Sequence, residues 1–215
     1  MFDLNGTLVT ENYLSHDEVF EDVLKYRRRG RALTPKDMGE VAKGQRPLSA
    51  VVEEVYEIDN SEMVSRKFIK TQASRVAFRE GAVDILEVLN EKYILILCSD
   101  TTGIAKEVVK RLKLLKFFSR IFYSCDVGFL KSEEEFWIEI MKHFPNSEPQ
   151  NFLVVGDNAR SDMYNPNRLK MHTVLIANPI KMAFDYRETS SEYDDEKPQY
   201  SIRELKELLP MLGLG

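Results

Sequence analysis

Apolar and polar positions follow two different patterns along this chain of 215 residues. Between about residues 12 and 78, apolar residues recur at helical spacing, and no segment has the pattern of a strand. From about residue 82 onward, continuous apolar runs, typical of strands buried on both faces, alternate with helical periodicity. Such alternation predicts a parallel sheet with right-handed crossovers. We therefore expect an α/β fold, a doubly wound parallel sheet with a small all-helical insert after the first strand.

The helical block is expected to contain four helices. The first spans about 15–29, where the apolar residues have helical spacing. Thr34 is a favoured N-cap and Pro35 suits the first helical position, so a second helix should begin there and stop at Gly44. The third should begin at Pro47, and the fourth at residue 60 or 61.

The remainder of the chain predicts strands and helices in alternation. Strands are expected at 1–4, 93–98, 120–124, 152–157 and 173–176. Helices are expected at 82–91, 104–112, 132–143 with Ser132 as N-cap, and 201–211, and a charged loop at 188–197. The first strand should be central, yet it has only Met1 to Leu4, where ~5–6 residues are usual. Either the strand starts upstream of Met1, or the sheet has a short middle strand.

Polar side chains stand where several of these strands end. Asp3, Ser99 and Asp157 each follow an apolar run, and Lys131 follows the 120–124 strand by a short loop. One crevice should contain all of them, because open parallel sheets place their ligand crevice at the carboxyl ends of the strands. A carboxylate there can act as a nucleophile or hold a metal. Taken singly, each has an ordinary alternative as a helix cap, a turn residue or a solvated lysine.

Composition narrows the function further. The chain has 30 basic and 35 acidic residues, a net charge of −5, which argues against a general nucleic-acid binder. No apolar run approaches the ~18 residues of a membrane span, and Met1 leads directly into a turn, so we expect neither membrane contact nor a signal peptide. The two cysteines read as reduced thiols, and three scattered histidines show no zinc-ligand spacing. A cytoplasmic location is the default expectation.

Four short motifs, in order, resemble those of the haloacid dehalogenase (HAD) superfamily. Motif I of its phosphatases is Asp-x-Asp-Gly-Thr-Leu, and residues 3–8 read Asp-Leu-Asn-Gly-Thr-Leu. Motif II is similar to Cys98-Ser99-Asp100, and motif III to the segment 128–132 with Lys131. Motif IV is similar to 154–158 followed by Asp162. The resemblance covers nearly the whole chain and implies a Rossmann-like hydrolase core.

The resemblance also implies a role for each residue. Asp3 would be the nucleophile that forms an aspartyl-phosphate, Ser99 would donate a hydrogen bond to the phosphoryl group, and Lys131 would neutralise charge. Magnesium prefers oxygen ligands, which Asp3, the carbonyl of Asn5, Asp157 and Asp162 would supply. Asp162 could instead cap a helix or orient Lys131. Further substrate contacts are expected from Thr7, unless it only ties down the turn, and from Asp100. The partner would be a small phosphorylated metabolite, and the protein a monomer or homodimer.

Asn5 is the largest departure from the family pattern. The phosphatases carry an Asp there that protonates the leaving oxygen and later activates water, and an amide cannot exchange a proton at neutral pH. Loss of a general acid or base typically costs ~10²–10⁴-fold in rate. The position could be engineered, the chain could be a weak or pseudo-phosphatase, or its chemistry could need no carboxylate there. A haloacid dehalogenase is a further alternative, although Asp157 and Asp162 suit magnesium, which those enzymes do not use.

The helical block resembles the small cap of the family. We expect residues 1–11 and 79–215 to form the core and residues 12–78 the cap, which closes over the crevice. Lys43-Gly44-Gln45-Arg46 is similar to the specificity loop of the beta-phosphoglucomutase and phosphoglycolate phosphatase branch. Lys43 or Arg46 could reach a substrate, or the segment could be an ordinary basic connection between helices. Arg79, at the expected hinge, is a weaker candidate.

Overall fold

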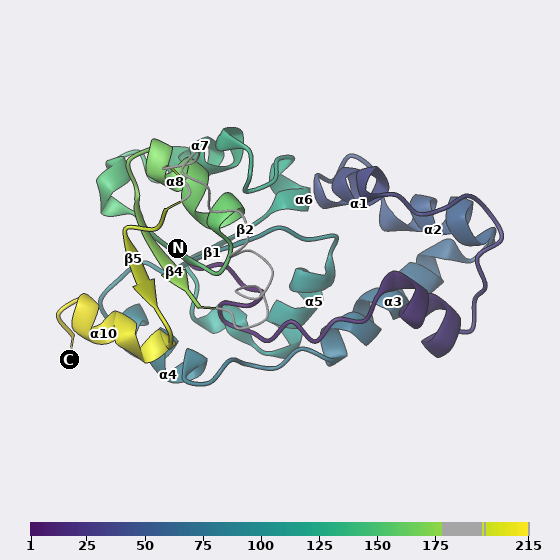
Figure 1. Ribbon diagram of the computed structural model, residues 1–215, viewed down its shortest axis with the longest axis horizontal. Coiled ribbons are helices and arrows are strands. Elements are labelled where there is room, and N and C mark those ends of the chain that lie inside the picture. Colours follow the sequence, from purple (N-terminus) through teal and green to yellow (C-terminus); the bar gives the residue numbers. More distant parts are fainter. Residues whose placement is uncertain (178–194, 196, 215) are drawn as a thin grey trace.

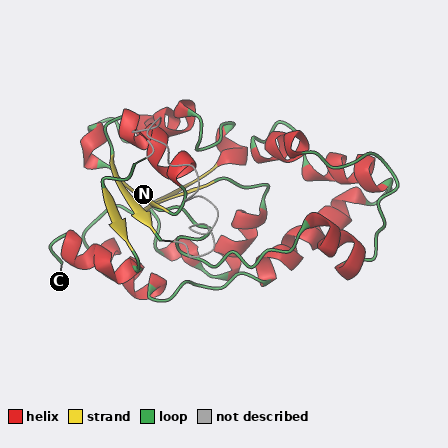
Figure 2. Cartoon of the chain, in the orientation of Figure 1, coloured by secondary structure: helices red, strands yellow, loops and turns green. Residues whose placement is uncertain are grey.

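A computed structural model describes residues 1–177, 195 and 197–214. Figure 1 shows a parallel sheet flanked by helices at one end of the molecule and a purely helical block at the other. Figure 2 shows that the strands lie between two helical layers. No helix among the described residues has the length and apolar character that a membrane crossing requires.

The elements follow the predicted order closely. Two π-helical segments cover Glu18–Val23 and Ala159–Tyr164, and 3₁₀ turns cover Leu114–Lys116, Pro149–Asn151 and Leu205–Glu207. The strands are β1 (Ile96–Ser99), β2 (Arg120–Tyr123), β3 (Leu153–Gly156), β4 (His172–Ile176) and β5 (Tyr200–Ile202). The helices are α1 (Pro35–Ala42), α2 (Leu48–Tyr56), α3 (Ser61–Ser74), α4 (Ala82–Asn90), α5 (Ile104–Arg111), α6 (Ser124–Val127), α7 (Glu134–Lys142), α8 (Asn165–Arg168) and α10 (Leu208–Met211).

The first residues of the chain join the sheet at its middle. β1 pairs with β2, and β3 with β4 and β5, all in parallel. Phe2 forms parallel bridges to Leu97 of β1 and Val155 of β3. The spatial order is therefore β2, β1, residues 1–4, β3, β4, β5. This confirms the predicted parallel α/β core, in which the first segment is central and short.

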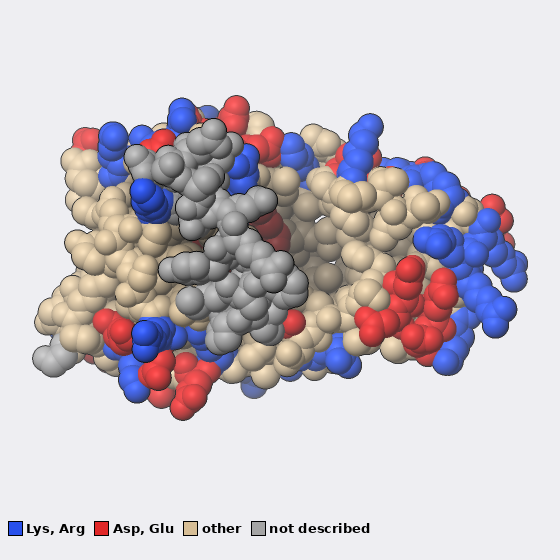
Figure 3. Space-filling model, in the orientation of Figure 1, with Lys and Arg blue, Asp and Glu red and all other residues tan. Residues whose placement is uncertain are grey.

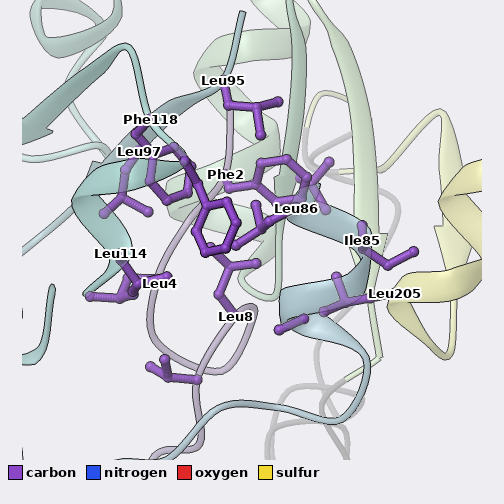
Figure 4. Packing of buried hydrophobic residues seen from close by; sticks show 14 of the residues in the cluster. Phe2, Leu4, Leu8, Ile85, Leu86, Leu95, Leu97, Leu114, Phe118 and Leu205 are labelled. Carbon is purple, nitrogen blue, oxygen red and sulfur yellow. The ribbon is translucent and has the colours of Figure 1, made fainter. Parts of the chain in front are cut away.

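Two hydrophobic clusters lie on the two faces of the sheet. On one face, α4, α5 and α10 cover Phe2, Leu97 and Val155. Figure 4 shows Leu86 beside Phe2, and Ile85 beside Leu205, in this cluster. On the other face, α7 contributes Phe136, Trp137 and Ile140, which pack with Met1, Ile96, Cys98 and Val154. Burial on both faces explains the continuous apolar runs of β1 and β3.

The helical block has a hydrophobic cluster of its own. Phe20, Val51, Val55, Val64 and Phe68 are buried in it. Thr34 caps α1 as predicted, and its hydroxyl and the side chain of Asp37 form a reciprocal capping box. The block meets the core where α3 contacts α5 and where α1 contacts α6. Both core helices follow strands at their carboxyl ends, so the block reaches the edge of the sheet where the crevice is expected.

The first predicted helix is wrong in length. Helical structure ends at Val23 rather than at residue 29, and Lys25 has a left-handed backbone with φ of 62°. Arg27, Arg28 and Arg29 are exposed, so no apolar packing supports further turns. Figure 3 shows basic side chains gathered at the end of the block that lies away from the sheet.

Two further boundaries differ from the prediction. Residues 201–211 are not one helix, because Tyr200–Ile202 form β5 beside β4, and helix α10 begins only at Leu208. The strand expected from residue 93 starts at Ile96, and Tyr93 and Ile94 are 44% and 65% exposed. Most of the charged loop expected at 188–197 lies outside the described residues.

The N-cap of α7 is Glu133, not Ser132. The chain makes one more turn before the helix, in which the Glu133 N–H donates to the Leu130 carbonyl. The Glu133 carboxylate accepts from the Leu130 N–H at 2.8 Å, which fixes this turn. Lys131 is thereby directed into the protein instead of toward solvent, and it is 3% exposed.

Candidate functional site

Lys131 lies at the centre of a buried ionic cluster. Its Nζ contacts Asp3 Oδ1 and lies 2.6 Å from Asp162 Oδ1. Its backbone is held on both sides, because its N–H donates to Asp100 Oδ1 at 2.9 Å and its carbonyl accepts from Trp137 Nε1 at 2.7 Å. The last contact ties the lysine to the core of α7. The predicted motif lysine is therefore a buried, oriented ammonium.

Three carboxylates gather beside this ammonium. One oxygen each of Asp3, Asp157 and Asp162 lies within 4.8 Å of the others, and all three residues are buried. Asp3 follows the central segment, Asp157 follows β3, and Asp162 lies in the π-helical turn behind it. With all groups ionised, the cluster carries two negative charges in excess, which one divalent cation balances. The donor set therefore fits a metal of the magnesium type.

Burial controls the ionisation of this cluster. Burial away from water raises the pKa of Asp3 to about 7, against the opposing charge of Lys131. Burial also favours the neutral amine of Lys131, but the charges of Asp162 and Asp3 outweigh it and raise the lysine pKa well above its ordinary value. Lys131 is thus a cation at neutral pH, and a further cation beside Asp3 would favour its ionised, nucleophilic form.

Asp162 is held in place by its own turn. Its Oδ2 accepts the Asn158 N–H at 3.0 Å, while Asn158 caps the following turn by accepting from Arg160 N–H and Ser161 N–H. Gly156 leaves the space that the carboxylate occupies, because a Cβ on it would lie 2.3 Å from Asp162 Cγ. The alternative that Asp162 orients Lys131 through an ion pair is realised, and its carboxylate also belongs to the metal-like trio.

In the turn after Asp3, Thr7 bonds the Asp3 carboxylate, whereas Asn5 bonds Tyr13 instead. Thr7 is fully buried, and its hydroxyl donates to Asp3 Oδ2 at 3.1 Å, so it fixes the second oxygen of that carboxylate. Asn5 Oδ1 accepts a hydrogen bond of 2.5 Å from the Tyr13 hydroxyl. Burial raises the pKa of Tyr13, and nearby Glu11 and Asp3 add to the rise, so the phenol stays protonated. No periodicity or motif in the sequence indicated a role for Tyr13.

Ser99 and Asp100 lie at the end of β1. Ser99 is fully buried, and its hydroxyl is 3.3 Å from the Asp100 carbonyl. Asp100 accepts the Lys131 N–H, and burial raises its pKa. The structure thus brings Ser99 and Asp100 to the same edge of the sheet as Asp3 and Asp157, while Asp100 acts on the Lys131 backbone.

Lys43 and Arg46 have different surroundings in the helical block. Lys43 Nζ lies 2.6 Å from Glu133 Oε1, which joins the block to the turn that carries Lys131. Gly44 beside it is so close to the core that a Cβ would lie 2.1 Å from the Cys125 carbonyl oxygen. Arg46 instead pairs with Asp37 and Glu54 inside the block. Glu133, which the sequence analysis did not single out, is the missed member of this contact.

Arg79 holds the base of the Asp3 turn. Its guanidinium donates to the Gly6 carbonyl at 2.7 Å and to the Ala177 carbonyl at 2.6 Å. Gly6 has φ of 76°, a left-handed conformation that glycine adopts without steric cost, and it allows the sharp turn after Asp3. Arg79 thus supports the loop from behind.

Comparison with known families identifies the family of this chain. The model of the haloacid dehalogenase-like hydrolase family matches residues 1–164. The chain belongs to this family. It is therefore a HAD-family hydrolase.

Relatives and solved structures give the same fold. The putative HAD-hydrolase YfnB of Bacillus subtilis is 27% identical over 172 residues, which cover 77% of this chain and 67% of YfnB. A crystal structure of YfnB bound to magnesium has a TM-score of 0.66 at 23% identity, with 98% of this chain and 96% of that chain covered. The 2-haloacid dehalogenase from Pseudomonas syringae pv. Tomato has a TM-score of 0.67 at 17% identity, with 99% and 96% covered.

One phosphatase is among the sequence relatives. The glyceraldehyde 3-phosphate phosphatase of Pyrococcus furiosus is 30% identical over 129 residues, which cover 60% of this chain. The match spans 51% of that phosphatase, about half its length. Phosphatases and dehalogenases are thus both similar to this chain, and the site itself has to distinguish between them.

Proposed function

We propose that this chain is a magnesium-dependent hydrolase of small phosphate monoesters that works through an aspartyl-phosphate on Asp3. The observation that carries the proposal is the cluster in which Lys131 contacts Asp3 and Asp162 while Asp157 completes a trio of carboxylates. A phosphoryl group carries spread negative charge, so its transfer depends on positioning and electrostatic stabilisation. The cluster supplies a positioned nucleophile and a fixed cation.

The proposed metal ligands are the carboxylates of Asp3, Asp157 and Asp162, together with the backbone carbonyl of Asn5. A carbonyl is indifferent to its side chain, so an amide at this position is compatible with metal binding. Magnesium at this place would neutralise charge on the phosphoryl oxygens and on the nucleophile.

The protein side chains have separate proposed tasks. Thr7 and Lys131 each hold one oxygen of Asp3, which aims the carboxylate at phosphorus. Ser99 would donate a hydrogen bond to a phosphoryl oxygen, and Lys131 would neutralise the phosphate together with the nucleophile. Asp100, which fixes the Lys131 backbone, contributes to this site by positioning. Thr7 is accordingly a positioning residue in this proposal.

Residues 12–78 are proposed to act as the cap over a core of residues 1–11 and 79–215. The separate hydrophobic cluster of the helical block and its contacts with α5 and α6 support this division. Lys43 is the stronger candidate to meet a small phosphorylated substrate, because it already lies against the core. Arg46 is a weaker one, since its guanidinium pairs with Asp37 and Glu54.

A second candidate function is binding without fast turnover, and Asn5 is the observation that favours it. An amide cannot give a proton to a leaving oxygen or take one from water. The chain would then keep the phosphate and metal site as a sensor or partner subunit. A dehalogenase is disfavoured, because three converging carboxylates with one ammonium leave excess negative charge that calls for a metal ion.

The test compares the chain with the variant Asn5→Asp on small alkyl phosphates such as glycerol phosphate, with and without magnesium. We expect magnesium-dependent hydrolysis to rise ~10²–10⁴-fold in the variant, the usual contribution of a general acid or base. Asn12→Asp is the matched control, because Asn12 is exposed and, among the described residues, its side chain hydrogen-bonds only to Thr10. If neither chain hydrolyses any ester while both bind magnesium, the binding function replaces the enzymatic one. If neither binds magnesium, the proposed site is wrong.

A further inference from the structure

The place where a leaving oxygen would take its proton holds an amide with a fixed orientation. The Tyr13 hydroxyl donates to Asn5 Oδ1, so the Nδ2 end of the amide is directed away from Tyr13. An N–H of this group can donate a hydrogen bond, but it cannot transfer a proton at neutral pH. The Tyr13 proton is itself engaged in this hydrogen bond. Asn5 and Tyr13 together can therefore offer a hydrogen bond to a leaving oxygen, but not a proton.

In the part of the chain that the structure describes, three other proton-bearing groups of the site already have partners. The Lys131 ammonium lies between Asp3 and Asp162, on the side of the nucleophile. The carboxylate of Asp100 accepts the Lys131 N–H at the end of β1. The Lys43 ammonium is paired with Glu133 at 2.6 Å. Among the described residues, these groups therefore give no proton to a departing, strongly basic alkoxide.

We propose that the site takes phosphoryl groups from donors whose leaving group departs without a proton, with acyl phosphates as the substrate class. This inference rests on the proposed function, because it uses Asp3 as the nucleophile. An Asp3 oxygen forms a bond to phosphorus while the bond from phosphorus to the acyl oxygen breaks. The electron pair of that bond stays on the acyl oxygen, which leaves as a carboxylate. A carboxylate is stable at neutral pH, so the step balances without an acid at position 5.

The Asn5 amide also slows the second step of the reaction, hydrolysis of the aspartyl-phosphate. Hydrolysis of the aspartyl-phosphate requires water to attack phosphorus and to lose a proton, and the Asn5 amide cannot accept one. The products, the Asp3 carboxylate and inorganic phosphate, therefore form slowly. Phosphorylated Asp3 accumulates when the donor is reactive. The chain thus behaves as a phosphoryl acceptor with a long-lived acyl phosphate of its own.

The experiment mixes the whole chain with magnesium and either acetyl phosphate or glycerol phosphate, then stops the reaction in acid. Mass spectrometry of the intact protein measures the fraction that carries one phosphoryl group. With acetyl phosphate we expect most of the protein to become phosphorylated, at least ~10²-fold faster than with glycerol phosphate, the lower range of a missing general acid. Asp3→Asn should carry no phosphoryl group, and Asn12→Asp should behave as the unchanged chain.

The variant Asn5→Asp separates this inference from the proposed function. It should still take the phosphoryl group from acetyl phosphate at a similar rate, but lose it ~10²–10⁴-fold faster, so that little phosphoprotein remains. Equal phosphorylation of the unchanged chain by both donors would overturn the inference, because another group would then supply the proton. If Asn5→Asp hydrolyses glycerol phosphate but the unchanged chain is not phosphorylated by acetyl phosphate, the inference fails and the proposed function stands. If neither the unchanged chain nor Asn5→Asp reacts with any donor, the inference and the proposed function are both wrong.

Discussion

Replacing Lys131 by methionine tests the electrostatic design of the cluster. Methionine has a similar length and no charge, and the backbone contacts of Lys131 with Asp100 and Trp137 do not need the ammonium. The change leaves the Asp3 and Asp162 carboxylates buried together, with side chains 7% and 1% exposed. Both have lost their shared cation, so the metal-free protein should be strongly destabilised.

The expected loss of stability follows from the distance between the two carboxylates. Two like charges within 4.8 Å repel by at least about 3.5 kcal/mol at an effective dielectric constant of about 20. Removal of one partner from buried ion pairs typically costs ~3–5 kcal/mol. We therefore expect Lys131→Met to lower the unfolding free energy by about 3–5 kcal/mol at pH 8, a large part of the ~5–15 kcal/mol usual for a domain.

The loss should depend on pH in one direction. In the unfolded chain, Asp3 titrates near pH 4. In the folded chain, burial raises the pKa of Asp3 to about 7 against the opposing charge of Lys131, and loss of that cation raises it further. The folded variant therefore binds more protons than its unfolded form above pH 4, and its stability falls as pH rises. The deficit relative to the unchanged chain should therefore be smallest near pH 4 and largest near pH 8.

Urea unfolding in the presence of a chelator, at several pH values, measures this deficit. The double variant with Asp162→Asn provides the control, because it removes one of the two repelling charges and should recover most of the loss. A deficit below about 1 kcal/mol at pH 8, or one that does not change with pH, would refute the electrostatic account, since neither fits a buried uncompensated charge.

Two glycines allow further predictions. Gly156→Ala places a Cβ 2.3 Å from Asp162 Cγ, so we expect a loss of about 1–3 kcal/mol in urea unfolding and weaker magnesium binding by calorimetry. Unchanged magnesium affinity would show that Asp162 is not a ligand. Gly44→Ala places a Cβ 2.1 Å from the Cys125 carbonyl oxygen at a φ of +67°, which should displace the helical block from the core and lower stability by about 1 kcal/mol or more. Gly39→Ala is its control: within α1, where nothing lies within 4 Å, it should stabilise by about 0.5–1 kcal/mol, and equal effects of the two changes would contradict the close contact.

The sequence predicted the parts of the structure that depend on local pattern. Buried strands such as β3 have continuous apolar runs, and the polar residues that follow them meet at one edge of the sheet for topological reasons. The sequence alone therefore places Asp3, Ser99 and Asp157 together. The cap of α1 was equally predictable, because Thr34 and Pro35 act within a single turn.

Features that depend on distant contacts were not predictable in this way. Ile202 joins the sheet as part of β5 only because the edge of β4 is available, and the segment has helical periodicity by itself. The N-cap of α7 is Glu133 instead of the predicted Ser132. The Glu133 carboxylate bonds the Leu130 N–H and also pairs with Lys43, which lies 90 residues away in the chain. Neither partner is implied by the local sequence.

Tyr13 shows how the fold completes what the sequence indicates at position 5. Asn5 was conspicuous in the sequence as a missing acid, but its identity alone did not show whether a neighbour replaces the lost function. In the fold, the Tyr13 hydroxyl donates a hydrogen bond to the oxygen of the amide, and so orients Asn5 without supplying an acid. A phenol that compensated for the missing carboxylate would instead keep its proton available to the leaving oxygen. The contact therefore favours selection of donors with stable leaving groups over slow hydrolysis of all phosphate esters alike.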